Sequence, residues 1–227
     1  MNSSIKPVKR QSVEVQAAES LRDSIIGGAL RPGERLTEIK LSEQLQISRA
    51  TVRTALHQLS KEGLIVQIPY TGWTVMTLSS RDAWELYTLR ASLEALAARL
   101  ASGQRSDAAR EKLETSYAAL AAACQRRDRA QIAEADFGLH KAIVEMAAHR
   151  RLAGQYQFVE QQIRIYIASS DALITDPDVI AAQHRPIVDA ILAGDAADAA
   201  RLAEDHNMVE GGKLVRHLRA EEAREAS

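Results

Sequence analysis

The stretch from Leu41 to Lys61 constrains the fold of this chain more than any other, because it predicts two short helices joined tightly at Ile47 and Ser48. The hydroxyl of Ser48 is placed to cap the second helix by accepting a bond from one of its first free amides. The apolar residues of this second helix recur at spacings of three and four and form one buried stripe: Val52, Ala55, Leu56 and Leu59. We therefore expect two helices packed through this stripe.

Two arginines occupy another face of the second helix. Arg49 and Arg53 lie four residues apart near its N-terminus. Two long cationic side chains on the opening turns of a helix that another helix braces are typical of a DNA-reading helix-turn-helix. An ordinary helical hairpin with solvated arginines is the alternative that these residues alone leave open.

The flanking segments favour the DNA-reading interpretation. A first helix is predicted from about Val13 to Gly27, and a Pro-Gly turn leads to a short strand at Arg35-Leu36. After the second helix of the pair, Leu64 to Ile68 and Trp73 to Thr77 are β-prone runs that form a hairpin. A hairpin in this position is a wing, and Gly72 permits its tip to approach the sugar–phosphate backbone closely. The predicted N-terminal domain, residues 1–77, is a winged helix-turn-helix that begins with a mobile arm, residues 1–10.

Charge and composition agree with two modest domains. The 227 residues carry a net charge of −1, but the balance is 10 Lys plus Arg against 7 Asp plus Glu through Thr77, and 19 against 23 afterwards. The basic excess thus coincides with the helix-turn-helix. Cys124 is the single cysteine, so an internal disulfide is excluded and a reducing compartment is favoured. The sequence contains neither an apolar run of membrane-spanning length nor a signal peptide's apolar core, so we expect a cytoplasmic protein without a membrane partner.

A short linker, residues 78–80, leads to a second domain, residues 81–227, in which every segment predicts helix. The predicted fold is therefore mainly α, with a helical-bundle effector domain after the winged head. The expected helices are Arg81 to Ser102, Asp107 to Arg126, Arg129 to Ala148, Arg151 to Ser170, Pro177 to Ala193 and Ala196 to Leu218. Arg219 to Ser227 is expected to be a frayed, charged tail.

Several polar residues lie on the apolar stripes of this second domain. Asp136 and His140 are four residues apart on one face, and His184 and His206 each fall on an inward stripe. An isolated buried carboxylate is costly, whereas a divalent metal ion suits imidazole nitrogen and carboxylate oxygen together. The alternative is a set of separate core histidines, each bonded to a backbone carbonyl. His57, His149 and His217 lack the pattern and are expected at the surface.

The N-terminal domain resembles the DNA-binding domain of the GntR family of bacterial transcription regulators. The resemblance rests on Gly-x-Leu-x-Pro-Gly-x-Arg-Leu, Ser-Arg-x-x-Val-Arg and Glu-Gly-Leu, which follow one another from about Leu21 to Met76. In that family the arginine after Pro-Gly-x and the two arginines of the second helix contact DNA. The resemblance therefore implies a DNA-contacting set made of Arg35, Ser48, Arg49, Thr51, Arg53 and Gly72.

The region from about Ser80 to Leu218 resembles the FCD effector domain of the FadR subfamily, in its shorter, six-helix VanR-like variant. That domain binds a metal through Asp-x-x-x-His and two later histidines, which match Asp136, His140, His184 and His206. The resemblance implies a divalent ion, with zinc favoured and nickel, manganese or iron as alternatives.

The same resemblance implies a small carboxylic acid as effector. Arg90 lies on a buried stripe and needs an anion, and its guanidinium suits a carboxylate. A structural pair with Glu94 is the alternative for Arg90. Arg164 and Tyr166 are weaker candidates for effector contacts.

The sequence thus predicts a homodimeric regulator, more often a repressor in this family, that binds an inverted-repeat operator in double-stranded DNA under the control of its effector. A metal-dependent enzyme using the Asp/His site is the rival interpretation. An architectural DNA-binding protein without a small ligand is a third, but it leaves the inward Asp and His residues unexplained.

Overall fold

The computed structural model describes residues 12–69 and 71–225 and divides the chain into two compact units, Met1–Thr77 and Leu78–Ser227. The predicted N-terminal arm, residues 1–10, lies outside the described residues.

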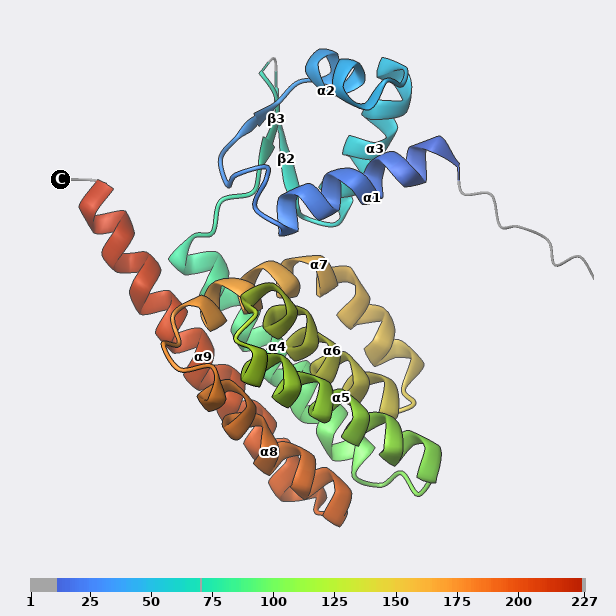
Figure 1. Cartoon of the computed structure of the whole chain (residues 1–227), viewed down its shortest axis with the longest axis vertical. Coiled ribbons are helices and arrows are strands. Elements are labelled where there is room, and N and C mark those ends of the chain that lie inside the picture. Colours follow the sequence, from blue (N-terminus) through green and yellow to red (C-terminus); the bar gives the residue numbers. More distant parts are fainter. Residues whose placement is uncertain (1–11, 70, 226–227) are drawn as a thin grey trace, which may run out of the picture. The chain divides into compact units, whose positions relative to one another are not determined.

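The first unit is built around three helices, α1 (Val13–Ile26), α2 (Glu38–Leu45) and α3 (Arg49–Lys61) (Figure 1). Each begins after a residue whose hydroxyl accepts a backbone N–H of the first turn; these capping residues are Ser12, Thr37 and Ser48. The predicted stripe of α3 is fully buried, and α1 packs against it. The helix-turn-helix is therefore held together as the apolar spacing predicted.

A small antiparallel sheet completes this unit. Strands β1 (Arg35–Leu36), β2 (Ile65–Ile68) and β3 (Gly72–Val75) are arranged in the order β1-β3-β2. The β2–β3 hairpin is the predicted wing, and β1 adds a third strand to it through the pairing of Leu36 with Trp73. Gly72 has φ +114, and a Cβ at this position would meet the Leu36 carbonyl oxygen at 3.3 Å. The start of β3, after the hairpin loop, therefore favours glycine.

The second unit is an all-α bundle, as predicted. Its described part contains α4 (Ser80–Ala101), α5 (Asp107–Arg126), α6 (Arg129–Met146), α7 (Arg150–Ala172), α8 (Asp178–Ala193) and α9 (Ala196–Glu225) (Figure 1). Its core is made of apolar residues from all six helices, and α4 and α9 make the most extensive packing in the unit. None of the helices that the structure describes has both the length and the apolar character to cross a membrane.

The expectation of a frayed tail after Leu218 was wrong for residues 219–225, which continue α9. The physical reason is a contact with the beginning of α4. The carboxylate of Glu222 accepts the backbone N–H of Ser80 at 2.7 Å and the hydroxyl of Ser80 at 2.8 Å. It thereby satisfies one of the free amides at the N-terminus of α4 and anchors the last turns of α9.

The α4–α9 contact depends on a glycine. A Cβ on Gly211 of α9 would lie 2.4 Å from Cγ of Tyr87 on α4. The side chain of Tyr87 therefore packs directly against the backbone of α9 at Gly211. Any larger residue at position 211 would displace the ring or separate the helices.

Candidate functional site

Four polar side chains from three helices converge in the core of the helical unit. Asp136 and His140 come from α6, His184 from α8 and His206 from α9. One ring nitrogen from each histidine lies within 4.8 Å of those of the other two. Oδ1 of Asp136 is 2.9 Å from Nε2 of His184 and 3.2 Å from Nε2 of His140, and the two Nε2 atoms are 3.1 Å apart. The structure thus brings together all four residues that the sequence singled out.

The separations among Oδ1 of Asp136 and the Nε2 atoms of His140 and His184 suit a metal ion. Ligand atoms at about 2.1 Å from a metal and at right angles to one another lie about 3 Å apart, and tetrahedral ligands lie slightly farther apart. Oδ1 of Asp136 is buried and has no hydrogen-bond partner, although two imidazole nitrogens lie close to it. A cation between these atoms would satisfy the orphaned oxygen. The donor set of one carboxylate and three imidazoles fits a divalent transition metal.

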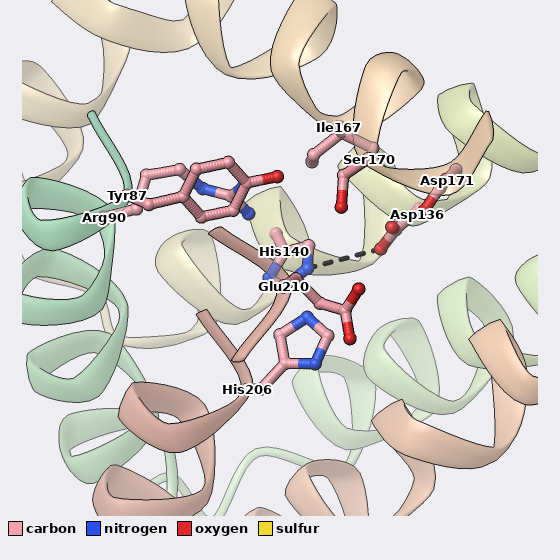
Figure 2. Close-up of a pocket in the computed structure, with 9 residues that line it drawn as sticks. All are labelled: Tyr87, Arg90, Asp136, His140, Ile167, Ser170, Asp171, His206 and Glu210. Carbon is pink, nitrogen blue, oxygen red and sulfur yellow. Dashed lines mark ion pairs between the residues drawn. The ribbon is translucent and has the colours of Figure 1, made fainter. Parts of the chain in front are cut away.

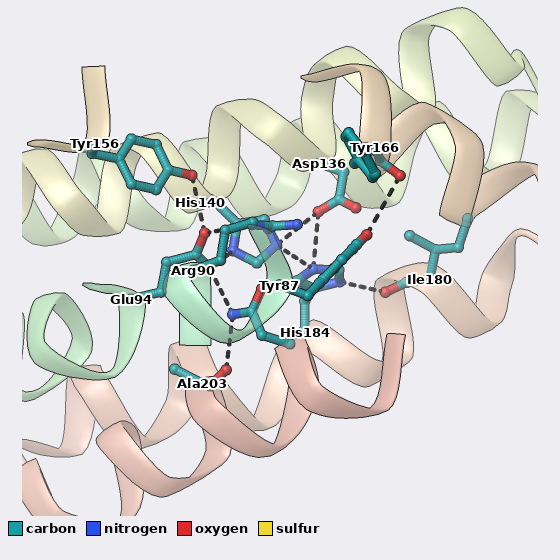
Figure 3. Close-up of polar contacts among 11 residues, drawn as sticks. Tyr87, Arg90, Glu94, Asp136, His140, Tyr156, Tyr166, Ile180, His184 and Ala203 are labelled. Carbon is teal, nitrogen blue, oxygen red and sulfur yellow. Dashed lines mark hydrogen bonds and ion pairs between the residues drawn. The ribbon is translucent and has the colours of Figure 1, made fainter. Parts of the chain in front are cut away.

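The outer nitrogen of each buried histidine is also engaged. Nδ1 of His184 is 2.7 Å from the backbone carbonyl oxygen of Ile180 and donates to it (Figure 3). Nδ1 of His140 is 2.8 Å from Oε2 of Glu94. Both arrangements place a proton on Nδ1, so in the neutral ring the lone pair of Nε2 faces Asp136. This fixed tautomer is the one that a metal-binding histidine uses.

Glu94 is the centre of a buried polar network (Figure 3). Its carboxylate accepts from Nε of Arg90 at 3.0 Å, from the hydroxyl of Tyr156 at 3.0 Å and from Nδ2 of Asn207 at 2.8 Å. The structural pair of Arg90 with Glu94, which the sequence left open as the alternative for Arg90, is therefore formed. Sequence reasoning missed Tyr156 and Asn207 because neither carries a spacing signal that links it to Glu94.

The charges of the cluster shift its ionisation. Burial favours the neutral ring of His140, but the charge of Glu94 and the closeness of the Asp136 and Glu94 carboxylates outweigh burial and raise the pKa to about 9. A metal ion would therefore displace the proton on Nε2 of this ring. Burial, followed by the charges of His184 and His140, holds the pKa of His206 well below its ordinary value. Burial opposes ionisation of Asp136, yet His184 and His140 hold its pKa well below the usual range. The cluster therefore contains an ionised carboxylate and at least one neutral imidazole, both of which are metal donors.

A small cavity, here called the inner cavity, adjoins the cluster (Figure 2). Its volume is about 10 Å³, room for about one water molecule. Three cluster residues and six others line it: Asp136, His140 and His206, with Tyr87, Arg90, Ile167, Ser170, Asp171 and Glu210. Burial, and next the charge of Asp136, raises the pKa of Asp171 to about 9, so this carboxyl is protonated at neutral pH. Arg90 is thus placed where an anion beside the cluster would meet it.

The structure does not place the other two effector candidates in this cavity. Arg164 pairs with Glu134 and stacks over the ring of Phe137, with 4.2 Å between its Cζ and the ring centroid. Tyr166 is fully buried, and its backbone oxygen accepts the hydroxyl of Tyr87 at 3.4 Å. Neither residue is among those that line the inner cavity. Spacing along α7 marks both residues as near the core, but it does not tell which neighbouring helices their side chains meet.

The winged unit presents the predicted DNA-contacting residues at the start of α3. Ser48 caps the helix by accepting the backbone N–H of Thr51 at 3.1 Å, and the two hydroxyls are 2.9 Å apart. Arg49 and Arg53 are more than half exposed. Sequence reasoning missed that Arg53 is paired, because its Nε and Nη2 donate to the carboxylate of Glu38 on α2.

The remaining two candidates lie at the wing. Arg35 is exposed on β1, and its guanidinium donates to the backbone carbonyl of Thr71 in the hairpin loop. Gly72 follows directly at the start of β3. The structure therefore holds Arg35 beside the wing loop, so that both can face the same segment of a partner.

The sequence matches two known domain families. Residues 14–75 match bacterial regulatory proteins of the gntR family, and residues 85–208 match the FCD domain. The chain belongs to the GntR family of bacterial regulators and carries an FCD domain. This finding agrees with the winged unit and the six-helix bundle that the structure describes.

The similarity to known relatives extends over most of this GntR-family chain. The chain is 30% identical over 197 residues to the "Probable D-xylose utilization operon transcriptional repressor" of Paenarthrobacter nicotinovorans, and the match covers 86% of this chain and 85% of that protein. It is 26% identical to the HTH-type transcriptional repressor RspR of Escherichia coli, covering 93% and 92%.

Among solved structures, a GntR transcriptional regulator from Rhodococcus sp. RHA1 superposes with a TM-score of 0.77 at 24% identity, covering 90% of this chain and 98% of that one. E. coli McbR/YncC superposes with a TM-score of 0.76 at 22% identity, covering 92% and 99%. These two likenesses establish the shared fold.

The GntR-family chain is therefore a DNA-binding transcriptional regulator with an FCD domain. Its relatives are regulators, so the rival interpretation as a metal-dependent enzyme is set aside. The cluster in its FCD domain has the residues and spacing to hold a metal ion.

Proposed function

We propose that this regulator is a repressor whose affinity for DNA is controlled by a small carboxylic acid bound at a divalent metal ion in the FCD domain. Asp136, His140, His184 and His206 hold the ion. The observation that carries this proposal is the convergence of these four donors around a buried carboxylate oxygen that has no hydrogen-bond partner. The Nδ1 atoms of His184 and His140 are held by the Ile180 carbonyl and by Glu94, which orients both rings. The ion, when bound, supplies a positive charge and open coordination positions for an acid's oxygens.

The residues beside the cluster prepare the site for an anion. Arg90 faces the inner cavity while Glu94 holds its Nε, which leaves the other guanidinium nitrogens for a carboxylate. The hydroxyl of Ser170 and the protonated carboxyl of Asp171 are further donors on the same wall. This set favours a carboxylate over a neutral sugar.

DNA binding is assigned to the opening turn of α3 and to the wing. A homodimer would place two copies of α3 in successive major grooves of an inverted-repeat operator, with Ser48, Arg49, Thr51 and Arg53 at the bases and phosphates. Arg35 and Gly72 would lie against the backbone at the wing. Repression is favoured because two relatives are named transcriptional repressors. A regulator of transcription acts where bacterial DNA lies, in the cytoplasm.

Effector control requires a differential affinity between two states of the protein. Coupling of about 1–3 kcal/mol between the acid and the operator changes operator affinity enough for regulation. The metal cluster connects α6, α8 and α9, so an acid that draws these helices together can alter the bundle as a whole.

The test measures metal content and DNA affinity together. Wild-type protein purified without chelator is expected to hold about one zinc, nickel, manganese or iron ion per chain by elemental analysis, and His184→Ala is expected to lose it. A duplex selected from a random library serves as the operator. Full metal occupancy in His184→Ala, or operator affinity that no carboxylate changes in the metal-loaded wild type, would refute the proposal. His217→Ala, an exposed histidine of α9, is the matched control.

A further inference from the structure

A second, larger hollow lies between α4 and α9 and shares the lining residue Tyr87 with the inner cavity. This outer pocket has a volume of about 300 Å³, against about 10 Å³ for the inner cavity. Trp84 and Met208 form its walls, and the buried side chains of Tyr87 and Val215 form its floor. The volume is that of a site for a small organic molecule.

The rim of the outer pocket is positively charged. Arg216 and Arg219, one turn apart on α9, both line it and are exposed. Within residues 12–69 and 71–225, neither arginine forms an ion pair. The lining includes no carboxylate, although Glu222, three residues beyond Arg219 on α9, interacts electrostatically with that arginine. An apolar floor below two guanidinium groups is complementary to an anion with an apolar body.

The walls of the outer pocket expose large apolar side chains to solvent. Trp84 is 54% exposed and Met208 is 46% exposed, although both are large apolar side chains. On the α9 side the lining includes Gly211, against which Tyr87 packs, and Gly212. A ligand of several carbons would cover this surface and remove it from water.

Tyr87 borders both spaces. It lines the outer pocket and the inner cavity, and its Cβ and ring atoms pack against Gly211. Its hydroxyl donates to the backbone oxygen of Tyr166 at 3.4 Å and also interacts with the hydroxyl of Ser170. An acid in the outer pocket would therefore contact a side chain that also lines the cavity beside the metal cluster.

We infer that the outer pocket is a second binding site, which takes a carboxylic acid with an apolar body of several carbons. The carboxylate pairs with Arg216 and Arg219, and the carbon chain packs on Trp84, Met208 and Val215. Binding here needs no metal ion. Only the connection of this site with regulation rests on the proposed function. An acid held in the outer pocket contacts Tyr87, which also lines the inner cavity beside the metal cluster.

The test uses the fluorescence of Trp84. The chain has two tryptophans, and the other, Trp73, is buried in the winged unit, so a ligand in the outer pocket changes the signal of Trp84. Octanoate, hexanoate and 1-octanol are titrated into wild-type protein in excess EDTA. We expect saturable binding of octanoate, about tenfold tighter than hexanoate because of two methylenes, and at least tenfold tighter than the uncharged 1-octanol.

Variants locate the site. R216A/R219A is expected to weaken octanoate at least tenfold and to abolish the preference over 1-octanol. R99A/R151A, which removes two exposed arginines elsewhere in the same unit, is expected to bind as wild type does. Trp84→Phe loses the signal but keeps the heat of binding in calorimetry.

Two results would overturn the inference. One is the absence of saturable octanoate binding by wild type, and the other is equal binding by R216A/R219A. If wild type binds no octanoate and its dimer dissociates in Trp84→Arg, the face is covered by a second copy instead. Since all titrations contain EDTA, loss of the metal site leaves these outcomes unchanged, and failure of the proposed function is seen separately in the metal content.

Discussion

Arg53 and Glu38 form a two-pronged ion pair across the helix-turn-helix. Nε and Nη2 of Arg53 donate to the two carboxylate oxygens of Glu38 at 2.8 Å and 2.7 Å. The bond from Arg53 is the main reason that the pKa of Glu38 lies below its ordinary value. Nη2 of Arg49 is 4.0 Å from the same carboxylate. One acid on α2 thus orients Arg53, a residue of the proposed DNA-contacting set.

We expect Glu38→Ala to reduce the specificity of DNA binding. Loss of the carboxylate frees Arg53 from its fixed orientation and removes a negative charge that repels phosphate. Affinity for random duplex should rise and the preference for the selected duplex should fall, as measured by fluorescence anisotropy over a range of salt concentrations. Glu43→Ala, an exposed acid on the same helix, removes the same charge without touching Arg53 and is the control. Equal behaviour of the two variants would show that charge alone matters.

Arg49→Ala should weaken operator binding by about 10- to 100-fold, since a good base contact supplies about 1–3 kcal/mol. The side chain is 60% exposed and makes only a distant ion pair, so the thermal unfolding of the protein should hardly change. Lys61→Ala, at the other end of α3, is the matched loss of charge. Operator affinity equal to that of wild type across a salt titration would remove Arg49 from the DNA-contacting set.

The sequence was informative where a helix carries its own signal. Asp136 and His140 share a face because they are four residues apart, and His184 and His206 each follow an apolar stripe. These spacings orient a side chain toward the core, and a single core of this size leaves few places for four inward polar groups to go. The stripe of α3 and its cap at Ser48 were predictable for the same reason.

What spacing cannot give is the partner of a buried group in another helix. Glu94 lies on the same stripe as Arg90, but its bonds to His140 and Asn207 depend on how α4, α6 and α9 are rotated against one another. The extension of α9 beyond Leu218 could not be predicted for the same reason, because it also depends on a contact with another helix. Residues 219–225 are rich in charge, and Glu222 stabilises them by accepting the backbone N–H of Ser80 at the start of α4.

We expect Glu94→Gln to lower metal affinity about 10- to 100-fold without preventing folding. An amide keeps the volume, but it loses the charge that polarises His140 through Nδ1. Competition with a zinc-binding dye measures the affinity. Glu145→Gln, an exposed acid on α6, is the control. Unchanged zinc affinity in Glu94→Gln would show that the network around Glu94 serves the fold alone.

Glu94→Ala should have a different effect from Glu94→Gln. Both variants remove the charge, but glutamine keeps an amide oxygen that can accept from Nε of Arg90, whereas alanine leaves this arginine, 1% exposed, without that acceptor. Removing one partner of a buried ion pair costs about 3–5 kcal/mol, so the midpoint of urea unfolding should fall sharply in metal-free protein. A midpoint equal to that of Glu94→Gln would mean that Arg90 finds another partner or water.

The anchor at the end of α9 should depend on pH. Hydrogen bonds from the backbone and then the hydroxyl of Ser80 lower the pKa of Glu222 from 4.5. A carboxyl with a depressed folded pKa contributes stability that is fully present above its unfolded pKa and is lost as pH falls through the folded value. Glu222→Gln should therefore speed amide exchange in residues 219–225 relative to wild type at pH 7, and this difference should narrow as pH falls below 4.5. Glu221→Gln, the neighbouring acid, which lies near His217 instead, should show no such difference. Equal exchange of Glu222→Gln and wild type at pH 7 would mean that the last turns of α9 are held without the contact to Ser80.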